Sequence, residues 1–302
     1  MNEVGSNPPS FLSALFLASR PKTLMACVVP IWLGGVLAYY LTGSFNLYLF
    51  VFTLLPALAI QIATNFFNDA IDYKKGADTK RRLGPKRMAG TGALAPESLL
   101  VAGIAFLMVA LTLSLVIVVE RGVILVVIGI PSLFFTYGYT GGPFPLAYRG
   151  MGELFVFIFF GLIAVSGTVF VQTGIWSNES FLLGGQVGML ATVLIAINNA
   201  RDIDEDKCAE KRTLAVRFGI NFAKFEIIFL CLAPFLMGAL WWFVFSNAKL
   251  ALIPLPGMLL ALVLCCYVYQ TAPGKRYNTF LGLAIVTLLL FAVLFTLAAF
   301  TQ

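Results

Sequence analysis

The sequence predicts an all-α protein of the polytopic membrane class, with nine transmembrane helices in one domain that spans residues 1–302. Three observations lead to this prediction. Of the 302 residues, 60% are hydrophobic and only 11% are charged, whereas soluble domains carry about 25% charged residues. Nine charge-free apolar stretches are each long enough to cross a bilayer. The basic residues, finally, collect in alternate loops between these stretches.

The apolar stretches follow one another along almost the whole chain. They cover residues 23–41, 47–67, 98–119, 122–140, 154–172, 180–200, 227–246, 250–270 and 278–300. We interpret the first as a retained helix and not a signal peptide, because Arg20 and Lys22 precede a full-length span and no small-residue cleavage site follows it. The apolar segment Phe11–Ser19 before it is predicted to be either an interfacial anchoring helix or part of a disordered tail over residues 1–20.

The distribution of charge predicts the orientation of the chain in the membrane. If the spans alternate, one side holds the N-terminus and the loops 68–97, 141–153, 201–226 and 271–277. That side carries 18 of the 20 Lys and Arg residues, all except Arg121 and Lys249. The positive-inside rule then places the N-terminus in the cytoplasm and the C-terminus outside. The net charge of +6 is thus explained by membrane topology, and no nucleic-acid partner is expected.

Residue usage excludes several classes of active site. The chain has no His, which excludes a Ser-His-Asp triad, a His-ligated metal and a His general base. Its five Cys residues show no metal-binding or redox spacing and mostly lie inside apolar stretches. The loops on the outer side are too short to form a site. We therefore expect function at the cytoplasmic end.

Two motifs rich in Asn and Asp begin where the second and sixth spans leave the membrane. In the first, the pairs Asn65/Asp69 and Asn68/Asp72 are spaced i,i+4, so each pair lies on one face of a helix. In the second, three residues repeat at four-residue intervals and predict a single oxygen-rich stripe. These residues are Asn198, Asp202 and Asp206.

The two motifs resemble each other at an offset of 130 residues, which indicates an internal parallel repeat. Asn68 and Asp72 align with Asn198 and Asp202, and Arg87 aligns with Arg217. Chance similarity between two charge-rich loops is the alternative explanation.

Oxygen-rich stripes at a membrane surface suit Mg²⁺, a hard cation usually shared between carboxylates and substrate phosphates. Basic residues follow both stripes and can bind the same phosphate oxygens. They are Arg81, Arg82, Lys86, Arg87, Lys211 and Arg212. The alternative is that these charges only solvate the loop ends. The Phe-rich segment that holds Phe155, Phe157, Phe159 and Phe160 predicts either a tunnel wall that shields an allylic cation or ordinary lipid-facing packing.

These residues resemble the UbiA-type intramembrane prenyltransferases, and most closely the branch that prenylates 1,4-dihydroxy-2-naphthoate on the way to menaquinone. The similarity covers nearly the full length. The segments that carry it are Arg20–Leu24, the first motif with the Arg-Leu-Gly-Pro that follows it, Tyr139–Pro143, Gly150–Glu153, Asn198–Asp202 and Lys211–Leu214.

The resemblance implies a nine-helix bundle around a central cavity, capped by cytoplasmic Asp-rich loops, in a bacterial inner membrane. It implies Mg²⁺ as cofactor, with Asp72 and Asp202 as catalytic residues. The implied metal ligands are Asn68, Asp69, Asp72, Asp78, Asn198, Asp202 and Asp206. The implied substrate-binding residues are Arg20, Lys22, Arg82, Lys86, Arg87, Tyr139, Arg201, Lys211 and Arg212. Arg20 and Lys22 would steer the acceptor's carboxylate, although both equally fit a role as positive-inside charges.

The sequence departs from the family pattern at two positions. Gly76 stands where the last Asp of the first motif is common, and the Asp is delayed to Asp78, as in the naphthoate branch. Glu210 replaces the Gly that usually precedes Lys-Arg-Thr-Leu.

The expected reaction transfers a polyprenyl group from its diphosphate to 1,4-dihydroxy-2-naphthoate, with loss of CO₂ and diphosphate, and gives demethylmenaquinone. Alternative acceptors are 4-hydroxybenzoate, homogentisate or a lipid-linked alcohol. From a different class, a secondary transporter with parallel repeats would require charged groups near the middle of the membrane, and the predicted spans have none.

Overall fold

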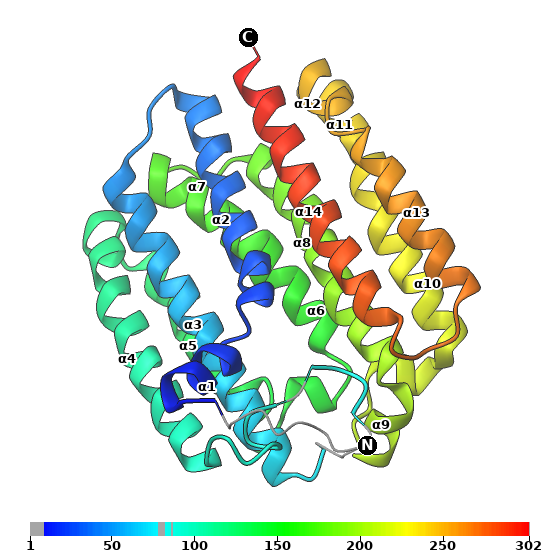
Figure 1. Ribbon diagram of the computed structural model, residues 1–302. Helices are drawn as coiled ribbons and strands as arrows, with labels where there is room; N and C mark the ends of the chain where they lie inside the picture. The colour runs from blue at the N-terminus through cyan, green and yellow to red at the C-terminus, as the bar shows by residue number, and fades with distance from the viewer. Residues whose placement is uncertain (1–8, 78–81, 86, 302) are drawn as a thin grey trace.

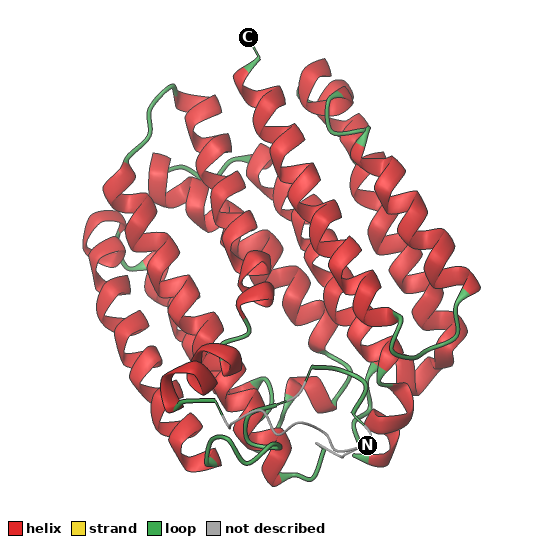
Figure 2. Cartoon of the chain, viewed as in Figure 1, coloured by secondary structure: helices red, strands yellow, loops and turns green. Residues whose placement is uncertain are grey.

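The computed structural model describes residues 9–77, 82–85 and 87–301, with helices and loops but no β-strand among them (Figures 1 and 2). Long helices run side by side, which confirms the predicted all-α membrane fold. Eight helical segments in this part of the chain are long and apolar enough to cross a membrane. In chain order they are α2 (Pro21–Thr42), α3 (Leu47–Lys74), α4 (Pro96–Arg121), the α6–η2–α7 segment (Gly152–Thr173), α8 (Asn178–Arg201), α10 with α11 (Leu214–Phe243), α12 with α13 (Ala248–Gln270) and α14 (Tyr277–Phe300).

The predicted span over residues 122–140 is shorter than expected. It forms α5 (Ile124–Gly138), and its 15 residues make a helix about 22 Å long, below the roughly 30 Å of a bilayer core. Gly122, with φ 89°, separates α5 from α4, and a turn at Tyr139 ends it. The prediction of nine full-length spans is therefore wrong, because α5 is too short to count as one. Helix α5 nevertheless crosses the bundle. The chain begins at one end, where α1 lies, and finishes at the other, where α14 ends (Figure 1), whereas eight crossings alone would return it to the end where it began.

The first described helix, α1 (Phe11–Ala18), lies across the end of the bundle opposite to the C-terminus (Figure 1). Ala14 and Ala18 are buried in a cluster with residues of α3 and α4. Leu12 and Phe16 point outward and are 77% and 64% exposed. A helix with one apolar face docked and another exposed is what the interfacial alternative requires.

Helix α8 is the central helix of the bundle. The α6–η2 segment packs against one side of it, and α10 and α14 also pack against it. The segment η2 (Phe157–Ile163) is a π-helix, which places Gly161 against the α8 backbone. A Cβ on Gly161 would lie 2.4 Å from the carbonyl oxygen of Gly184 and 2.4 Å from Cα of Gly188. Glycines on both helices thus permit close backbone packing, as is common between membrane helices.

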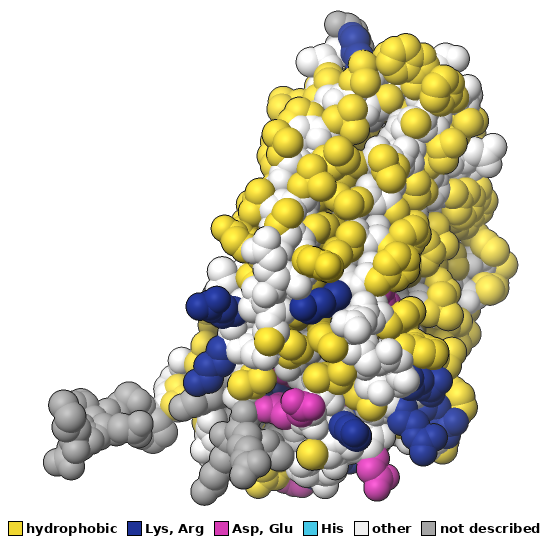
Figure 3. All heavy atoms as spheres, turned by 90° about the vertical axis from the view of Figure 1, so that its right-hand side faces the viewer, with side chains coloured by type: hydrophobic (Ala, Val, Ile, Leu, Met, Phe, Trp, Pro, Cys, Tyr) yellow, Lys and Arg dark blue, Asp and Glu magenta, His cyan; other side chains and the backbone are white. Residues whose placement is uncertain are grey.

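The surface divides into an apolar band and a charged end (Figure 3). Large apolar side chains of α4 point outward, with Val101 67% and Val119 84% exposed. Lys, Arg, Asp and Glu side chains gather at the end where α1 and the polar loops lie. Exposed apolar side chains along whole helices indicate contact with lipid, so the chain is an integral membrane protein.

Candidate active site

A cavity of about 350 Å³ lies within the half of the bundle formed by α2 to α8. Its described lining residues come from α2, α3, α4, α5, the α6–η2–α7 segment and α8. None comes from α10, α13 or α14, so the cavity is off-centre. It ends near the charged end of the bundle, where the lining includes Asn68 and Asn198, one from each predicted motif.

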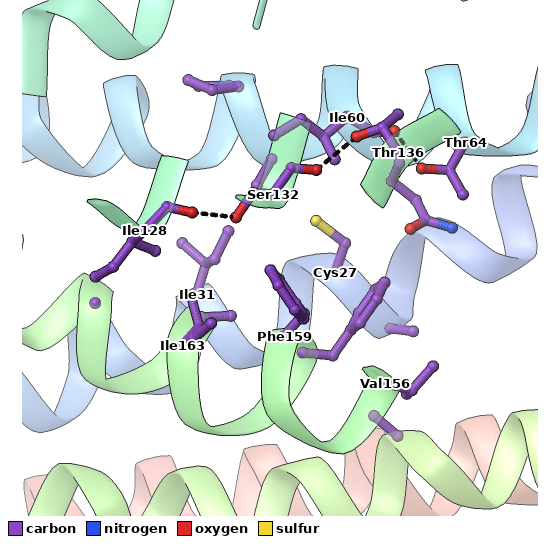
Figure 4. A pocket seen from close by; sticks show the side chains of 18 of the residues that line it. Cys27, Ile31, Ile60, Thr64, Ile128, Ser132, Thr136, Val156, Phe159 and Ile163 are labelled. Carbon is purple, nitrogen blue, oxygen red and sulfur yellow. Dashed lines mark hydrogen bonds between the residues drawn. The ribbon is translucent and has the colours of Figure 1, made fainter. Parts of the chain in front are cut away.

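The wall of the cavity is apolar although several hydroxyl side chains line it. Thr64 donates its hydroxyl proton to the Ile60 carbonyl, Ser132 to Ile128 and Thr136 to Ser132, each at 2.8 Å (Figure 4). Because each donor is satisfied within its own helix, the wall offers mainly hydrocarbon surface to a ligand. Apolar cavities with a few polar groups at one end are typical of ligand sites.

Aromatic rings line the same cavity close to its polar end. Phe155 and Phe159 stack with ring centroids 4.2 Å apart, and Tyr139 contacts Phe155 at 5.4 Å. Phe160 also lines the cavity, whereas Phe157, the other member of the predicted cluster, does not. Three of the four phenylalanines singled out in the sequence thus face the cavity.

Asp72 is the centre of the charged cluster at the end of α3. It is 2% exposed, and its Oδ2 lies 2.5 Å from Arg87 Nη1 and 4.0 Å from Lys211 Nζ. Tyr148, in the short helix η1 (Leu146–Tyr148), donates its hydroxyl proton to Asp72 Oδ1 at 2.7 Å. Side chains from three distant segments therefore meet at this carboxylate.

Lys211 links the two predicted motifs. Its Nζ lies 3.7 Å from Asp206 Oδ1, in addition to its contact with Asp72, and 5.3 Å from the centre of the Tyr148 ring. Burial raises the pKa of Asp206 to about 6, an effect that the nearby Lys211 partly offsets. Glu210, directly before Lys211, has φ 55°, a left-handed conformation that favours glycine, which explains why a Gly is expected there.

The second stripe is interrupted at Asp202. Helix α8 ends at Arg201 and α9 (Ile203–Cys208) begins after Asp202, so the residues of the predicted stripe belong to two consecutive helices. Backbone i,i+4 hydrogen bonds still join Asn198 to Asp202 and Asp202 to Asp206. Arg201 donates to both carboxylate oxygens of Asp202 at 2.6 Å, a bidentate pair that neutralises this carboxylate.

The described residues 82–85 of the loop after the first motif are held by Glu205, which follows α8, and by Asn278 of α14. The backbone N–H of Leu83 donates to Glu205 Oε1 at 3.1 Å, and its carbonyl accepts from Asn278 Nδ2 at 2.9 Å. Asn278 also accepts a hydrogen bond from Arg201 Nη1 at 2.7 Å. Gly84 lies so close to Arg201 that a Cβ would be 2.6 Å from Nη2.

Asp69 does not join this charged cluster. Its two oxygens accept hydrogen bonds from the backbone N–H groups of Met88 and Ala89 at 2.9 and 3.1 Å, and its side chain is buried. The structure thus gives Asp69 a loop-holding role, and its metal-binding role stays a prediction. Asn65 is occupied likewise, because its amide donates to the Ser19 carbonyl at 2.8 Å.

Arg20 lies in the turn between α1 and α2, in a left-handed conformation with φ 52°. Its Nη2 atom is buried without a hydrogen-bond partner. Burial and the nearby Arg87 lower the pKa of Arg20 to about 10, while Asp69 and Asp72 act in the opposite direction. The guanidinium therefore stays charged at neutral pH and belongs to the same electrostatic cluster as Asp72.

The other predicted residues divide into three groups. Asp78 and Lys86 lie outside the described residues, as does the side chain of Lys22 in the first turn of α2. Arg82 donates to the Pro85 carbonyl at 3.1 Å. Arg212 is exposed and uses its backbone N–H to bind the Tyr148 carbonyl.

Comparison with known proteins assigns the chain to a family. The UbiA prenyltransferase family matches residues 27–288. The chain belongs to this family. It is 35% identical over 227 residues to the 1,4-dihydroxy-2-naphthoate octaprenyltransferase of Bacillus subtilis, covering 75% of this chain and 71% of that one. Its identity to the enzyme of the same name from Haemophilus influenzae is 36% over 209 residues, 67% of this chain and 68% of that one.

A solved UbiA homolog from Archaeoglobus fulgidus, bound to DMAPP and Mg²⁺, has a similar fold with a TM-score of 0.60 at 14% identity. The match covers 91% of this chain and 99% of that one. With the sequence relatives, it establishes that this chain has the UbiA architecture and is a prenyltransferase.

Four residues in the UbiA-type site were not predicted as functional from the sequence. Tyr148 binds Asp72, Thr140 donates its hydroxyl proton to Asn68 Oδ1, and Asn278 binds Arg201. Glu205, which is not part of the predicted stripe, holds Leu83. Three of these side chains are uncharged and none follows the spacing of the motifs, so no local pattern singles them out.

Proposed function

We propose that the protein transfers a polyprenyl group from polyprenyl diphosphate to 1,4-dihydroxy-2-naphthoate and releases diphosphate and CO₂, giving the hydroquinone form of demethylmenaquinone. The observation that carries the proposal is an apolar cavity that ends at Asn68 and Asn198, one helical turn from Asp72 and Asp202. Relatives at 35% and 36% identity bear the name of this activity. The cavity suits a polyprenyl chain, and the charged cluster suits its diphosphate.

The oxygen donors at this end fit Mg²⁺ bound together with substrate. No three Asp, Glu or Cys side chains among the described residues form a closed metal site. Mg²⁺ does not require one, because it typically uses one or two carboxylates, waters and substrate phosphates. Asn68, Asp72, Asn198, Asp202 and Asp206 would hold it. Bound Mg²⁺ would neutralise the charge that develops on the diphosphate as its bond to the allylic carbon breaks.

The protein's basic residues have a second role in this scheme. Arg87 and Lys211 now neutralise Asp72 at 2.5 and 4.0 Å, and both can turn to the diphosphate oxygens when substrate enters. The rings of Phe155 and Phe159 face the position where an allylic cation would form and stabilise it by cation–π interaction. The apolar wall keeps water from intercepting that cation.

The acceptor reacts at the ring carbon that bears its carboxylate. A C–C bond forms to the allylic carbon as the C–O bond to diphosphate breaks. The bond to the carboxylate then breaks, its electrons restore the aromatic ring, and CO₂ leaves. No base has to remove a proton from that carbon, which suits a chain without His. The unpartnered Nη2 of Arg20 is the group we assign to orient the carboxylate.

The test uses purified protein, octaprenyl diphosphate and separate acceptors, with products identified by mass. We expect prenylated product with 1,4-dihydroxy-2-naphthoate, loss of activity in excess chelator and recovery with Mg²⁺. Turnover of 4-hydroxybenzoate or homogentisate in place of the naphthoate would assign another acceptor. Full activity in chelator would refute the metal role.

We also propose that the charged end faces the cytoplasm of a bacterial cell and that the C-terminus lies outside. The 18-to-2 distribution of Lys and Arg supports this orientation. A reporter active only in the cytoplasm should function when inserted in loop 205–220 and fail at the C-terminus. Activity at the C-terminus would contradict the orientation.

A further inference from the structure

Two glycines line the cavity, Gly129 on α5 and Gly167 on α7. A Cβ added to either would meet no atom within 4 Å apart from the neighbouring backbone of its own helix. Neither residue has a positive φ, so the backbone at both positions accepts an L-amino acid without strain. Neither packing nor backbone conformation therefore requires glycine here.

Other glycines of the bundle differ in this respect. A Cβ on Gly34 would lie 2.7 Å from Thr168 Cβ, and one on Gly103 would lie 2.6 Å from the Phe67 ring. Those glycines allow neighbouring helices to approach each other. At Gly129 and Gly167, by contrast, the missing side chain leaves free volume inside the cavity.

Both positions lie far from the charged end. Gly129 precedes Tyr139 by ten residues along α5, a distance of about 15 Å along the helix. In Figure 4, Ile128 and Ile163 lie at the end of the cavity opposite to Thr64 and Val156. Gly129 follows Ile128 directly, and Gly167 is one turn beyond Ile163. A chain whose diphosphate lies near Asp72 reaches this region only after its first few isoprene units.

We infer that Gly129 and Gly167 determine how long a prenyl chain the cavity accepts. This inference rests on the proposed function, in which the cavity holds the prenyl chain. A side chain at either position would fill the path of a long chain while leaving the space near Asp72 unchanged. The two glycines are therefore specificity-determining positions for polyprenyl donors.

The experiment compares Gly129→Leu and Gly167→Leu with the wild type, using geranyl and octaprenyl diphosphate as donors. We expect kcat/KM for octaprenyl diphosphate to fall about tenfold to a hundredfold, the usual effect of filling an apolar pocket. For geranyl diphosphate it should stay within about twofold of the wild type. Gly282→Leu is the matched control, because Gly282 is an exposed helical glycine on α14 with nothing within 4 Å of its Cβ.

An equal loss with both donors, or unchanged turnover of octaprenyl diphosphate, would overturn the inference. If either leucine variant fails to fold, the alanine variant at the same position should show the same donor preference with a smaller change. The activity of the wild type distinguishes failure of this inference from failure of the proposed function. A wild-type protein that uses neither donor refutes the proposed function, whereas a wild type active with both and insensitive variants refute only the role of the glycines.

Discussion

Substitution of Asp72 by Asn should remove activity and also destabilise the fold, and the two effects can be separated. Asp72 is 2% exposed, and its partner Arg87 is 7% exposed with the charged atoms 2.5 Å apart. Removing one member of a buried ion pair leaves the other charge uncompensated, which typically costs about 3–5 kcal/mol. We therefore expect Asp72→Asn to lower the free energy of unfolding by about that amount.

The double variant Asp72→Asn/Arg87→Gln removes both charges and should recover most of the lost stability. It should still lack transferase activity, because the proposed metal ligand is absent. Stability is measured by denaturing-detergent titration of the purified protein, and activity by transfer of a labelled prenyl group. Glu97→Gln is the control, since Glu97 pairs with Lys74 on the surface and an exposed ion pair contributes little to stability. A single variant as stable as the wild type, or a double variant that is active, would refute this reasoning.

Three further predictions concern the site and the bundle. Metal binding requires the carboxylate form of Asp206, and burial raises the pKa of this group to about 6. The Mg²⁺ concentration for half-maximal activity should therefore rise as the pH falls through about 6. Asp206→Asn should remove this pH dependence. Tyr148→Phe removes the hydrogen bond to Asp72 Oδ1 and should raise KM for the prenyl diphosphate roughly tenfold. An unchanged KM would show that this hydrogen bond does not contribute to substrate binding. Gly161→Ala should lower the free energy of unfolding by about 1–3 kcal/mol through overpacking, whereas Gly282→Ala should change it little.

Much of the fold could be predicted because a membrane imposes length and apolarity on each helix. Each of the nine apolar stretches contains at least one helix in the structure. The length of α5 was overestimated because apolar composition continues through Gly122 and Tyr139, where the backbone leaves the helix. The π-helix at Phe157–Ile163 was not predicted, since its i,i+5 hydrogen bonds leave no mark in a uniformly apolar segment.

The candidate site was only partly predictable. The spacing of the motifs predicted which residues share a helix face, and Asn68 and Asn198, one from each motif, both line the cavity. It could not distinguish Asp69 from Asp72, because that distinction depends on which carboxylate meets the backbone of the loop near Met88. Tyr148 lies 76 residues from Asp72, so only tertiary structure brings the two together.

The predicted repeat illustrates the same limit. Arg87 pairs with Asp72, but its aligned counterpart Arg217 donates to the carbonyls of Arg212 and Arg149. Similar positions in two motifs thus have different partners, because the segments that surround them differ.

The most direct test of the central claim follows the carboxylate of the acceptor. Purified protein is incubated with Mg²⁺, octaprenyl diphosphate and 1,4-dihydroxy-2-naphthoate carrying ¹³C in its carboxyl group. Our account predicts that labelled CO₂, diphosphate and a prenylated product without the label form in equal amounts. A prenylated product that keeps the labelled carboxylate, or no reaction with this acceptor alongside turnover of 4-hydroxybenzoate, would contradict it.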